Sequence, residues 1–238
     1  MADLGSWGFF AKVSIQPSEV PSDRTGFPVY VDLSDLDATF FNEVQSDGAD
    51  IRVTESDRST LVPREVESID TGAQTGELWF KAPSLSSSNV TDFYVFFGNA
   101  SASAPAVTDP NGRNAVWSDY AGVRHNGATE DSTGNFGAPS QNTVTPGGAT
   151  GQIGDATLYS GGDEVQYASN TALDFGTGDF HISAWLQVGD TPDGGAVIDL
   201  YSGDTSPGFM FKWRSGMALL TADGANGYDQ RFGNNFSN

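Results

Sequence analysis

The chain has 238 residues, no cysteine, and 31 Asp and Glu against 11 Lys and Arg, which gives a formal net charge of −20. The lack of cysteine excludes disulfides, zinc–thiolate sites and thiol nucleophiles. The acidic balance argues against binding to nucleic acid or an anionic membrane, because both need clustered cations. We interpret the charge as a solvated surface, or as adaptation to a salty habitat; divalent-cation binding is the alternative.

The first residues contain no targeting signal that we can identify. Residues 1–12 lack the apolar segment of a secretory signal. The longest apolar runs are a few residues long, far short of the ~20 that span a bilayer. We therefore expect a protein that is made in the cytoplasm and does not insert into a membrane.

The first hundred residues alternate between apolar and polar side chains, which is the pattern of half-buried strands. Strands are expected over residues 7–15, 29–33, 51–53, 77–81 and 93–97. The last of these is apolar on both faces, which predicts a central strand.

One short helix is expected between the second and third of these strands. Leu36, Phe40 and Val44 recur with the period of a helix after Ser34, which we predict to be its N-cap. The single apolar stripe would pack on a sheet.

Glycine and proline divide the chain. Residues 1–111 contain only seven of the 29 glycines, and Pro105 and Pro110 interrupt a run of small residues. Such a segment resists regular structure. We therefore place a first module at residues 1–104, a linker at residues 105–114 and a second module at residues 115–238.

The second module is also predicted to be β. Residues 179–188 alternate most clearly, and further strands are expected over residues 196–201, 209–213 and 217–221. Strands separated by Gly- and Pro-rich turns at this spacing are typical of sandwiches and jelly rolls. The predicted fold class is all-β, with two β-sandwich or jelly-roll modules in tandem.

Motifs in both halves carry a family resemblance. In the first module they are Phe27-Pro28-Val29 and residues 46–52, 65–67, 77–81 and 97–99. Together they resemble a domain of unknown function that precedes laminin-G or concanavalin A-like domains in phage and bacterial surface proteins. Residues 115–123, 131–135 and 180–186 are similar to that following jelly roll. Family jelly rolls continue beyond the point where this sequence ends, so we expect an incomplete sandwich, either part of a longer protein or finished by another chain.

Two glutamates and two histidines are candidates for catalysis. Glu65 and Glu67 would share one face of a strand, as the paired carboxylates of a glycosidase do, whereas Asp70 would not. We favour a solvated strand face for the pair. His125 and His181 lack the partners of a catalytic triad or a metal pair; we interpret His125 as solvent-facing and His181 as a sheet residue. The sequence therefore predicts a protein that is not an enzyme.

No cofactor is expected to be required, and calcium is the ion for which ligands can be named. Asp47 with Asp50, and Asp131 with Asn135, offer pairs of oxygen ligands. The resemblance to laminin-G-type domains implies calcium at a loop rim. Calcium takes about 6–8 oxygens, which neither pair supplies alone, so acidic turns are the interpretation that we favour.

The candidate ligand-binding residues lie in or beside loops of the second module. They are Tyr201, Asp204, Trp213 and Tyr228. Sugars stack on exposed aromatic rings and form hydrogen bonds with carboxylates, so these residues would contact a glycan. For Trp213 alone, a core position is favoured.

The expected function is that of a bacteriophage virion structural protein on the particle surface, in a tail fibre, spike or head decoration. The first module would anchor to other virion proteins and the second would bind a host surface glycan for attachment. A homo-oligomer is expected, a trimer if the protein forms a fibre. The alternative is a bacterial cell-surface or secreted carbohydrate-binding module attached to a polysaccharide-degrading system; a free-standing glycosidase is a weaker rival.

Overall fold

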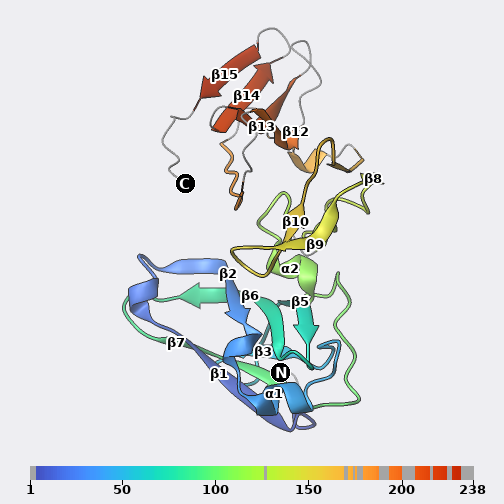
Figure 1. Ribbon diagram of the computed structural model, residues 1–238. Coiled ribbons are helices and arrows are strands. Elements are labelled where there is room, and N and C mark those ends of the chain that lie inside the picture. The colour runs from blue at the N-terminus through green and yellow to red at the C-terminus, as the bar shows by residue number, and fades with distance from the viewer. Residues whose placement is uncertain are drawn as a thin grey trace. The chain divides into compact units, whose positions relative to one another are not determined.

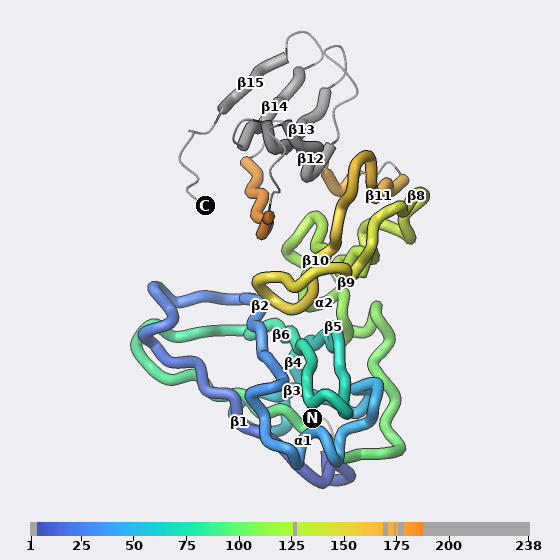
Figure 2. Tube along the Cα trace, in the orientation of Figure 1, coloured from blue at the N-terminus to red at the C-terminus, as the bar shows by residue number. Residues whose placement is uncertain are grey.

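The structure, a computed structural model, describes residues 4–125, 128–168, 171–173, 175 and 179–187, and the backbone of four strands between residues 193 and 231. Contacts divide the chain into two units. The first comprises Met1–Tyr159 and Asp163–Leu173, and the second comprises Ser160–Gly162 and Asp174–Asn238. Figures 1 and 2 trace the chain, and the two units are described separately.

Two antiparallel sheets form the body of the first unit (Figure 1). One has the strand order β1-β7-β3-β4 and the other the order β2-β6-β5. The strands are β1 (Phe9–Ile15), β2 (Arg24–Asp32), β3 (Arg52–Glu55), β4 (Leu61–Val62), β5 (Arg64–Asp70), β6 (Thr75–Leu85) and β7 (Thr91–Phe97). All five strands predicted for this region are confirmed, and β7 is central, between β1 and β3, as its two apolar faces indicated.

The core lies between the facing sides of these sheets. Leu78 and Phe80 of β6 and Phe93 and Val95 of β7 are all buried in one hydrophobic cluster. The rings of Phe80 and Phe93 lie 4.7 Å apart between centroids and so join the two sheets. Each fully buried side chain of this kind stabilises the fold by roughly 1.5–3 kcal/mol.

The predicted helix is present, but its cap is different. A 3-10 turn, η2 (Leu33–Asp35), precedes α1 (Ala38–Glu43). Phe40 is buried on the predicted stripe, whereas the N-cap is Asp37, which accepts hydrogen bonds from the first turn of α1. Ser34 lies inside the 3-10 turn, where both its amide and its hydroxyl donate to Asp32. It therefore does not cap α1.

A buried carboxylate holds the turn before β3. Asp50 Oδ2 accepts hydrogen bonds from Gly98 N over 2.7 Å and from Asn99 N over 3.0 Å. Gly98 has a φ of +82°, and a Cβ there would lie 2.6 Å from Cδ2 of Phe9. Only glycine fits such a position. The two sequence motifs that contain Asp50 and Gly98 therefore contact each other, and the hydrogen bonds of Asp50 hold this joint between them together.

The rest of the first unit follows β7. Its elements are α2 (Arg113–Val116), β8 (Gln141–Asn142), β9 (Thr145–Thr150), β10 (Asp155–Leu158), β11 (Val165–Gln166) and η3 (Thr171–Leu173). The antiparallel pairs are β9 with β10 and β8 with β11. Since α2 packs on β5 and β6, contacts run across the segment predicted as a linker, and the module boundary at residues 105–114 stays a prediction.

The second unit contains a four-stranded antiparallel sheet in sequence order, with the strands β12 (Asp193–Asp199), β13 (Pro207–Arg214), β14 (Met217–Asp223) and β15 (Gly227–Arg231). Three predicted strands fall on β12, β13 and β14. The strand predicted at residues 179–188 is wrong over its described part, 179–187, where Trp185 is 70% exposed. Alternation shows which side chains could share a face, but a strand also needs a partner for its backbone.

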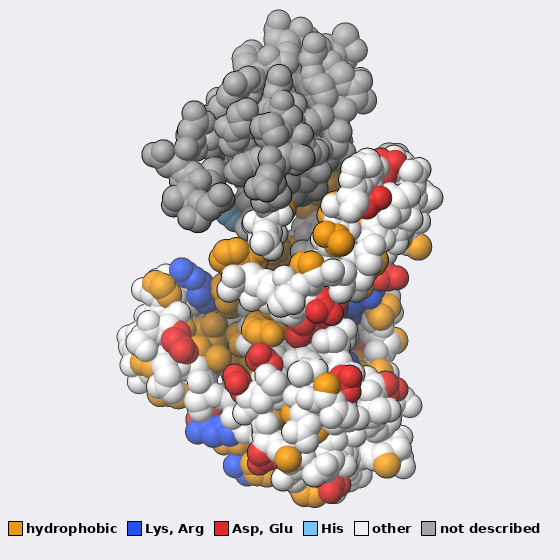
Figure 3. Space-filling model, viewed as in Figure 1, with side chains coloured by type: hydrophobic (Ala, Val, Ile, Leu, Met, Phe, Trp, Pro, Cys, Tyr) orange, Lys and Arg blue, Asp and Glu red, His pale blue; other side chains and the backbone are white. Residues whose placement is uncertain are grey.

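The all-β class is confirmed: the described part of the chain is mostly antiparallel strand, with α1 and α2 as its two short α-helices. No helix among the described residues has the length and apolar character to cross a membrane. Acidic side chains are scattered over the described part of the face in Figure 3. That distribution agrees with a solvated acidic surface.

Candidate functional site

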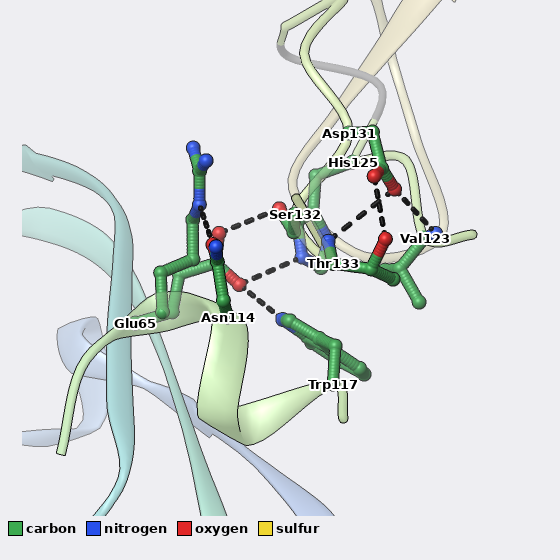
Figure 4. A network of polar contacts seen from close by, with 9 residues as sticks. Glu65, Asn114, Trp117, Val123, His125, Asp131, Ser132 and Thr133 are labelled. Atoms are coloured by element: carbon green, nitrogen blue, oxygen red, sulfur yellow. Dashed lines mark hydrogen bonds and ion pairs between the residues drawn. The ribbon is translucent and has the colours of Figure 1, made fainter. Parts of the chain in front are cut away.

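Glu65 on β5 is the centre of a polar network that joins this strand to the chain after α2 (Figure 4). Trp117 Nε1 donates to Glu65 Oε2 over 2.5 Å, and Ser132 Oγ donates to Oε1 over 2.6 Å. His125 Nε2 lies 3.1 Å from Oε2 and forms an ion pair with it when the ring is protonated. One carboxylate therefore binds three side chains that lie far downstream in the sequence.

This network corrects two expectations. Glu65 is only 4% exposed, so it does not lie on a solvated strand face. The side chain of His125 is 13% exposed and does not face solvent. The reason is tertiary: Glu65 lies opposite Trp79 in the register, on the sheet face away from the core, and α2 packs over β5 and β6.

The loop that brings His125 and Ser132 to Glu65 is closed by a second carboxylate, Asp131. It accepts hydrogen bonds from Val123 N over 2.9 Å, Thr133 N over 3.3 Å and Thr133 Oγ1 over 2.5 Å (Figure 4). A fourth comes from Phe136 N over 3.1 Å. Gly134 is needed in this loop, because its φ is +78° and an added Cβ would lie 2.2 Å from Nδ2 of Asn114. Asp131 thus fixes the loop from within.

Aromatic rings surround the network. The centroid of Trp79 lies 5.2 Å from that of Trp117 and 5.5 Å from that of His125, with the last pair stacked at 30°. Trp117 and His125 are 5.3 Å apart. The rings exclude water, which strengthens the electrostatic interactions that they enclose. Nε1 of Trp79 is buried and has no hydrogen-bond partner among the described residues.

Two more carboxylates act on this site electrostatically. Burial raises the pKa of Glu67 and of Glu77. Burial alone would lower the pKa of His125, but the hydrogen bond and charge of Glu65, with the charges of Glu67 and Glu77, outweigh it and raise that pKa. The site therefore favours a positive charge on or near the imidazole.

Three of these groups could hold a metal ion. Glu65, Glu67 and His125 each offer one ligand atom, and those atoms all lie within 4.8 Å of one another. The expectation that Glu65 and Glu67 share a side of β5 is confirmed by this clustering.

The structure does not test the predicted glycan-binding residues. Tyr201 and Asp204 lie outside the described residues. Trp213 lies on β13 and Tyr228 on β15, and their side chains are likewise outside the described part. Glycan contact at these four residues stays a prediction.

The predicted calcium ligands are engaged in turns and loops. Asp47 Oδ1 accepts from Ala49 N over 3.0 Å, and Asn135 Nδ2 donates to Ala121 O over 3.1 Å. Asp50 and Asp131 accept the backbone hydrogen bonds described above. These contacts are those of acidic turns, which was the favoured interpretation, and calcium at these residues stays a prediction.

Sequence reasoning missed the meeting of Glu65 with His125. The available signals were the spacing of Glu65 and Glu67 and the rarity of histidine, with two in the chain. No local pattern encodes a contact across 60 residues. His181, the other histidine, lies in residues 179–187, which do not form a strand. The expectation that it is a sheet residue is therefore wrong.

Comparison with known proteins found one similarity, which covers part of this site. Residues 47–117 match a family described as a domain of unknown function (DUF2341). The match includes the turn of Asp50, the strands β3 to β7 and Glu65, and it ends at Trp117. Searches of curated proteins and of solved structures found no match. The N-terminal part of the chain is therefore similar to a domain of unknown function.

Proposed function

We propose that the protein is a non-enzymatic structural protein on the surface of a bacteriophage virion, where it forms part of a tail fibre, spike or head decoration. The observation that carries the proposal is the environment of Glu65. The best candidate for a catalytic carboxylate is buried, and it binds Trp117, His125 and Ser132 of the same chain.

The distance between carboxylates alone does not decide this point. Oxygens of Glu65 and Glu67 lie within 4.8 Å, close to the ~5–5.5 Å separation of retaining glycosidases. A glycosidase must also admit a sugar between the two groups. Both oxygens of Glu65 accept hydrogen bonds from buried donors, so the carboxylate acts as a clamp between β5 and the loop after α2.

The first module, residues 1–104, would anchor the protein to other virion proteins, and the second module, residues 115–238, would reach the host. The sheet of β12 to β15 supports a laminin-G or concanavalin A-like jelly roll, since that fold is built from antiparallel strands joined by tight turns. In this proposal Tyr201, Asp204, Trp213 and Tyr228 contact a host glycan. A homo-oligomer, trimeric in a fibre, would multiply weak glycan contacts into firm attachment.

The location is tested by mass spectrometry of purified phage particles and of the host cell envelope. We expect the chain in the particles at a fixed ratio to the capsid protein. Its presence only in the envelope, or in secreted polysaccharide-degrading complexes, would favour the carbohydrate-binding module instead.

The binding role is tested on a glycan array with the full chain. We expect binding that the double substitution Trp213→Ala and Tyr228→Ala weakens at least tenfold, since stacked rings supply much of the affinity for sugars. The change Tyr120→Ala, at an exposed ring of the first unit, is the control and should have no effect. Release of reducing sugars from the bound glycan would contradict a non-enzymatic role.

A further inference from the structure

The cluster on β5 contains a carboxylate that the hydrogen-bond network does not use. Glu67 is partly buried, and no hydrogen bond reaches its carboxylate among the described residues. It is close to a second carboxylate, Glu65, and to the imidazole of His125. Two neighbouring acids away from water are costly unless a cation compensates them.

We propose that Glu65, Glu67 and His125 bind one divalent transition-metal ion, of which Zn²⁺ is the representative probe. The three ligand atoms already lie within 4.8 Å of one another. In a tetrahedral site, Zn–O and Zn–N bonds of about 2.0–2.2 Å place two ligand atoms about 3.3–3.6 Å apart. Movements of these ligand atoms by about 1.5 Å or less toward a common centre would therefore complete the site.

The donor set selects the class of metal. Two carboxylate oxygens and one imidazole nitrogen suit Zn²⁺, Mn²⁺ and Fe²⁺. Calcium and magnesium prefer ligand sets made of oxygen alone and would not gain from His125. This proposal differs from the calcium alternative considered at Asp47, Asp50, Asp131 and Asn135, because it uses other residues and another class of ion.

The surroundings of the cluster resemble the outer sphere of a metal site. Trp117 Nε1 and Ser132 Oγ hold the two oxygens of Glu65, as hydrogen-bond donors around metal-binding carboxylates do. Glu77 adds a negative charge nearby, and Arg113 opposes it. With His125 neutral, three acids face one cation, so a divalent ion would bring the group close to electrical balance.

Metal binding must displace the proton that His125 shares with Glu65. A ligating imidazole is neutral, so the Nε2–H bond breaks, the proton leaves to solvent and Nε2 donates its lone pair to the metal. The ion then bridges the two groups that the hydrogen bond now joins. The affinity should accordingly rise with pH until His125 is fully deprotonated.

The test is calorimetric titration of the full chain with ZnCl₂ after dialysis against EDTA. We expect one ion bound per chain. Glu67→Gln keeps the size of the side chain and removes its charge, and it should weaken binding by more than about 100-fold, since loss of an outer-sphere partner alone costs about 10–100-fold. Ser132→Ala should weaken binding by about tenfold, through Glu65.

The matched control is Glu55→Gln on β3, because Glu55 is a partly buried acid that lies outside the ligand cluster and is not among the charges that act on Glu67 or His125. It should retain binding within about threefold. Circular dichroism of all variants in EDTA should match that of the wild type, which separates lost ligands from lost fold.

Three results would overturn the proposal: no Zn²⁺ bound by the folded wild type, equal binding by Glu67→Gln, or an equal loss in Glu55→Gln. Tight Ca²⁺ binding that Glu67→Gln abolishes would also contradict the assigned class of metal. Titrations in two buffers of different ionisation enthalpy at pH 6 should show release of about one proton per ion. These outcomes do not depend on where the protein acts or on its glycan.

Discussion

Replacing Glu65 with alanine removes the acceptor that three enclosed donors share, and we expect a large loss of stability in the first unit. Trp117 Nε1 and Ser132 Oγ would lose their partner, and His125 would lose its counter-charge. A hydrogen bond to a charged group contributes about 1.5–3 kcal/mol, and breaking a buried ion pair costs about 3–5 kcal/mol. Since these contributions share one carboxylate and do not add, we expect a total of about 3–5 kcal/mol.

Urea unfolding at pH 7 in EDTA, followed by tryptophan fluorescence, measures this loss. Trp79 and Trp117 surround the network, so their emission reports on the first unit. A loss of that size is a large part of the ~5–15 kcal/mol by which a typical domain is stable. The midpoint for Glu65→Ala should therefore fall sharply with little change in slope.

The matched control is Glu67→Ala on the same strand. No hydrogen bond reaches that carboxylate among the described residues, so its removal should not lower stability by more than about 0.5 kcal/mol. A cost below about 1 kcal/mol for Glu65→Ala, or equal costs for the two variants, would refute the clamp.

Three further changes test other parts of the fold. Asp50→Ala leaves backbone amides of the joint unpaired, including that of Gly98, and should cost about 2–5 kcal/mol in urea unfolding; an unchanged midpoint would contradict this. Gly98→Ala places a Cβ 2.6 Å from Phe9 at a φ of +82° and should cost about 1–3 kcal/mol in thermal unfolding, whereas a neutral result would show that the ring moves freely. The pKa of His125 is raised from its ordinary value of 6.5, so its contribution to stability should be complete below that pH and lost as pH rises through the folded value. Thermal unfolding between pH 5 and pH 9 should show this fall in stability with pH, and His125→Gln should remove most of it.

The strands of the first unit could be predicted because each carries its own pattern. In each strand, apolar side chains recur at every second position and so lie on one side of the sheet. Val53 of β3, Leu78 of β6 and Phe93 of β7 are examples, and all three are buried. Residues 179–187 are the exception. Phe180, Ile182 and Leu186 fall on one face of the predicted strand, yet the segment is not a strand, because pairing depends on a second segment that the pattern does not specify.

The helix cap shows the same limit on a smaller scale. Ser34 and Asp37 are both good N-caps by residue type, and the sequence did not decide between them. The 3-10 turn η2 settled the choice, because it engages Ser34 with Asp32 and lets α1 begin after Asp37.

By itself, the sequence determined the all-β class, the central position of β7 and the acidic surface, since period, residue type and charge are local properties of the chain. Only the tertiary structure decided the role of Glu65 and His125. Their chemistry depends on burial and on a contact between residues 60 positions apart, which arises when α2 and the loop closed by Asp131 cover β5. A carboxylate that looks solvated along the chain becomes a buried acceptor, because water is excluded by side chains from elsewhere in the fold.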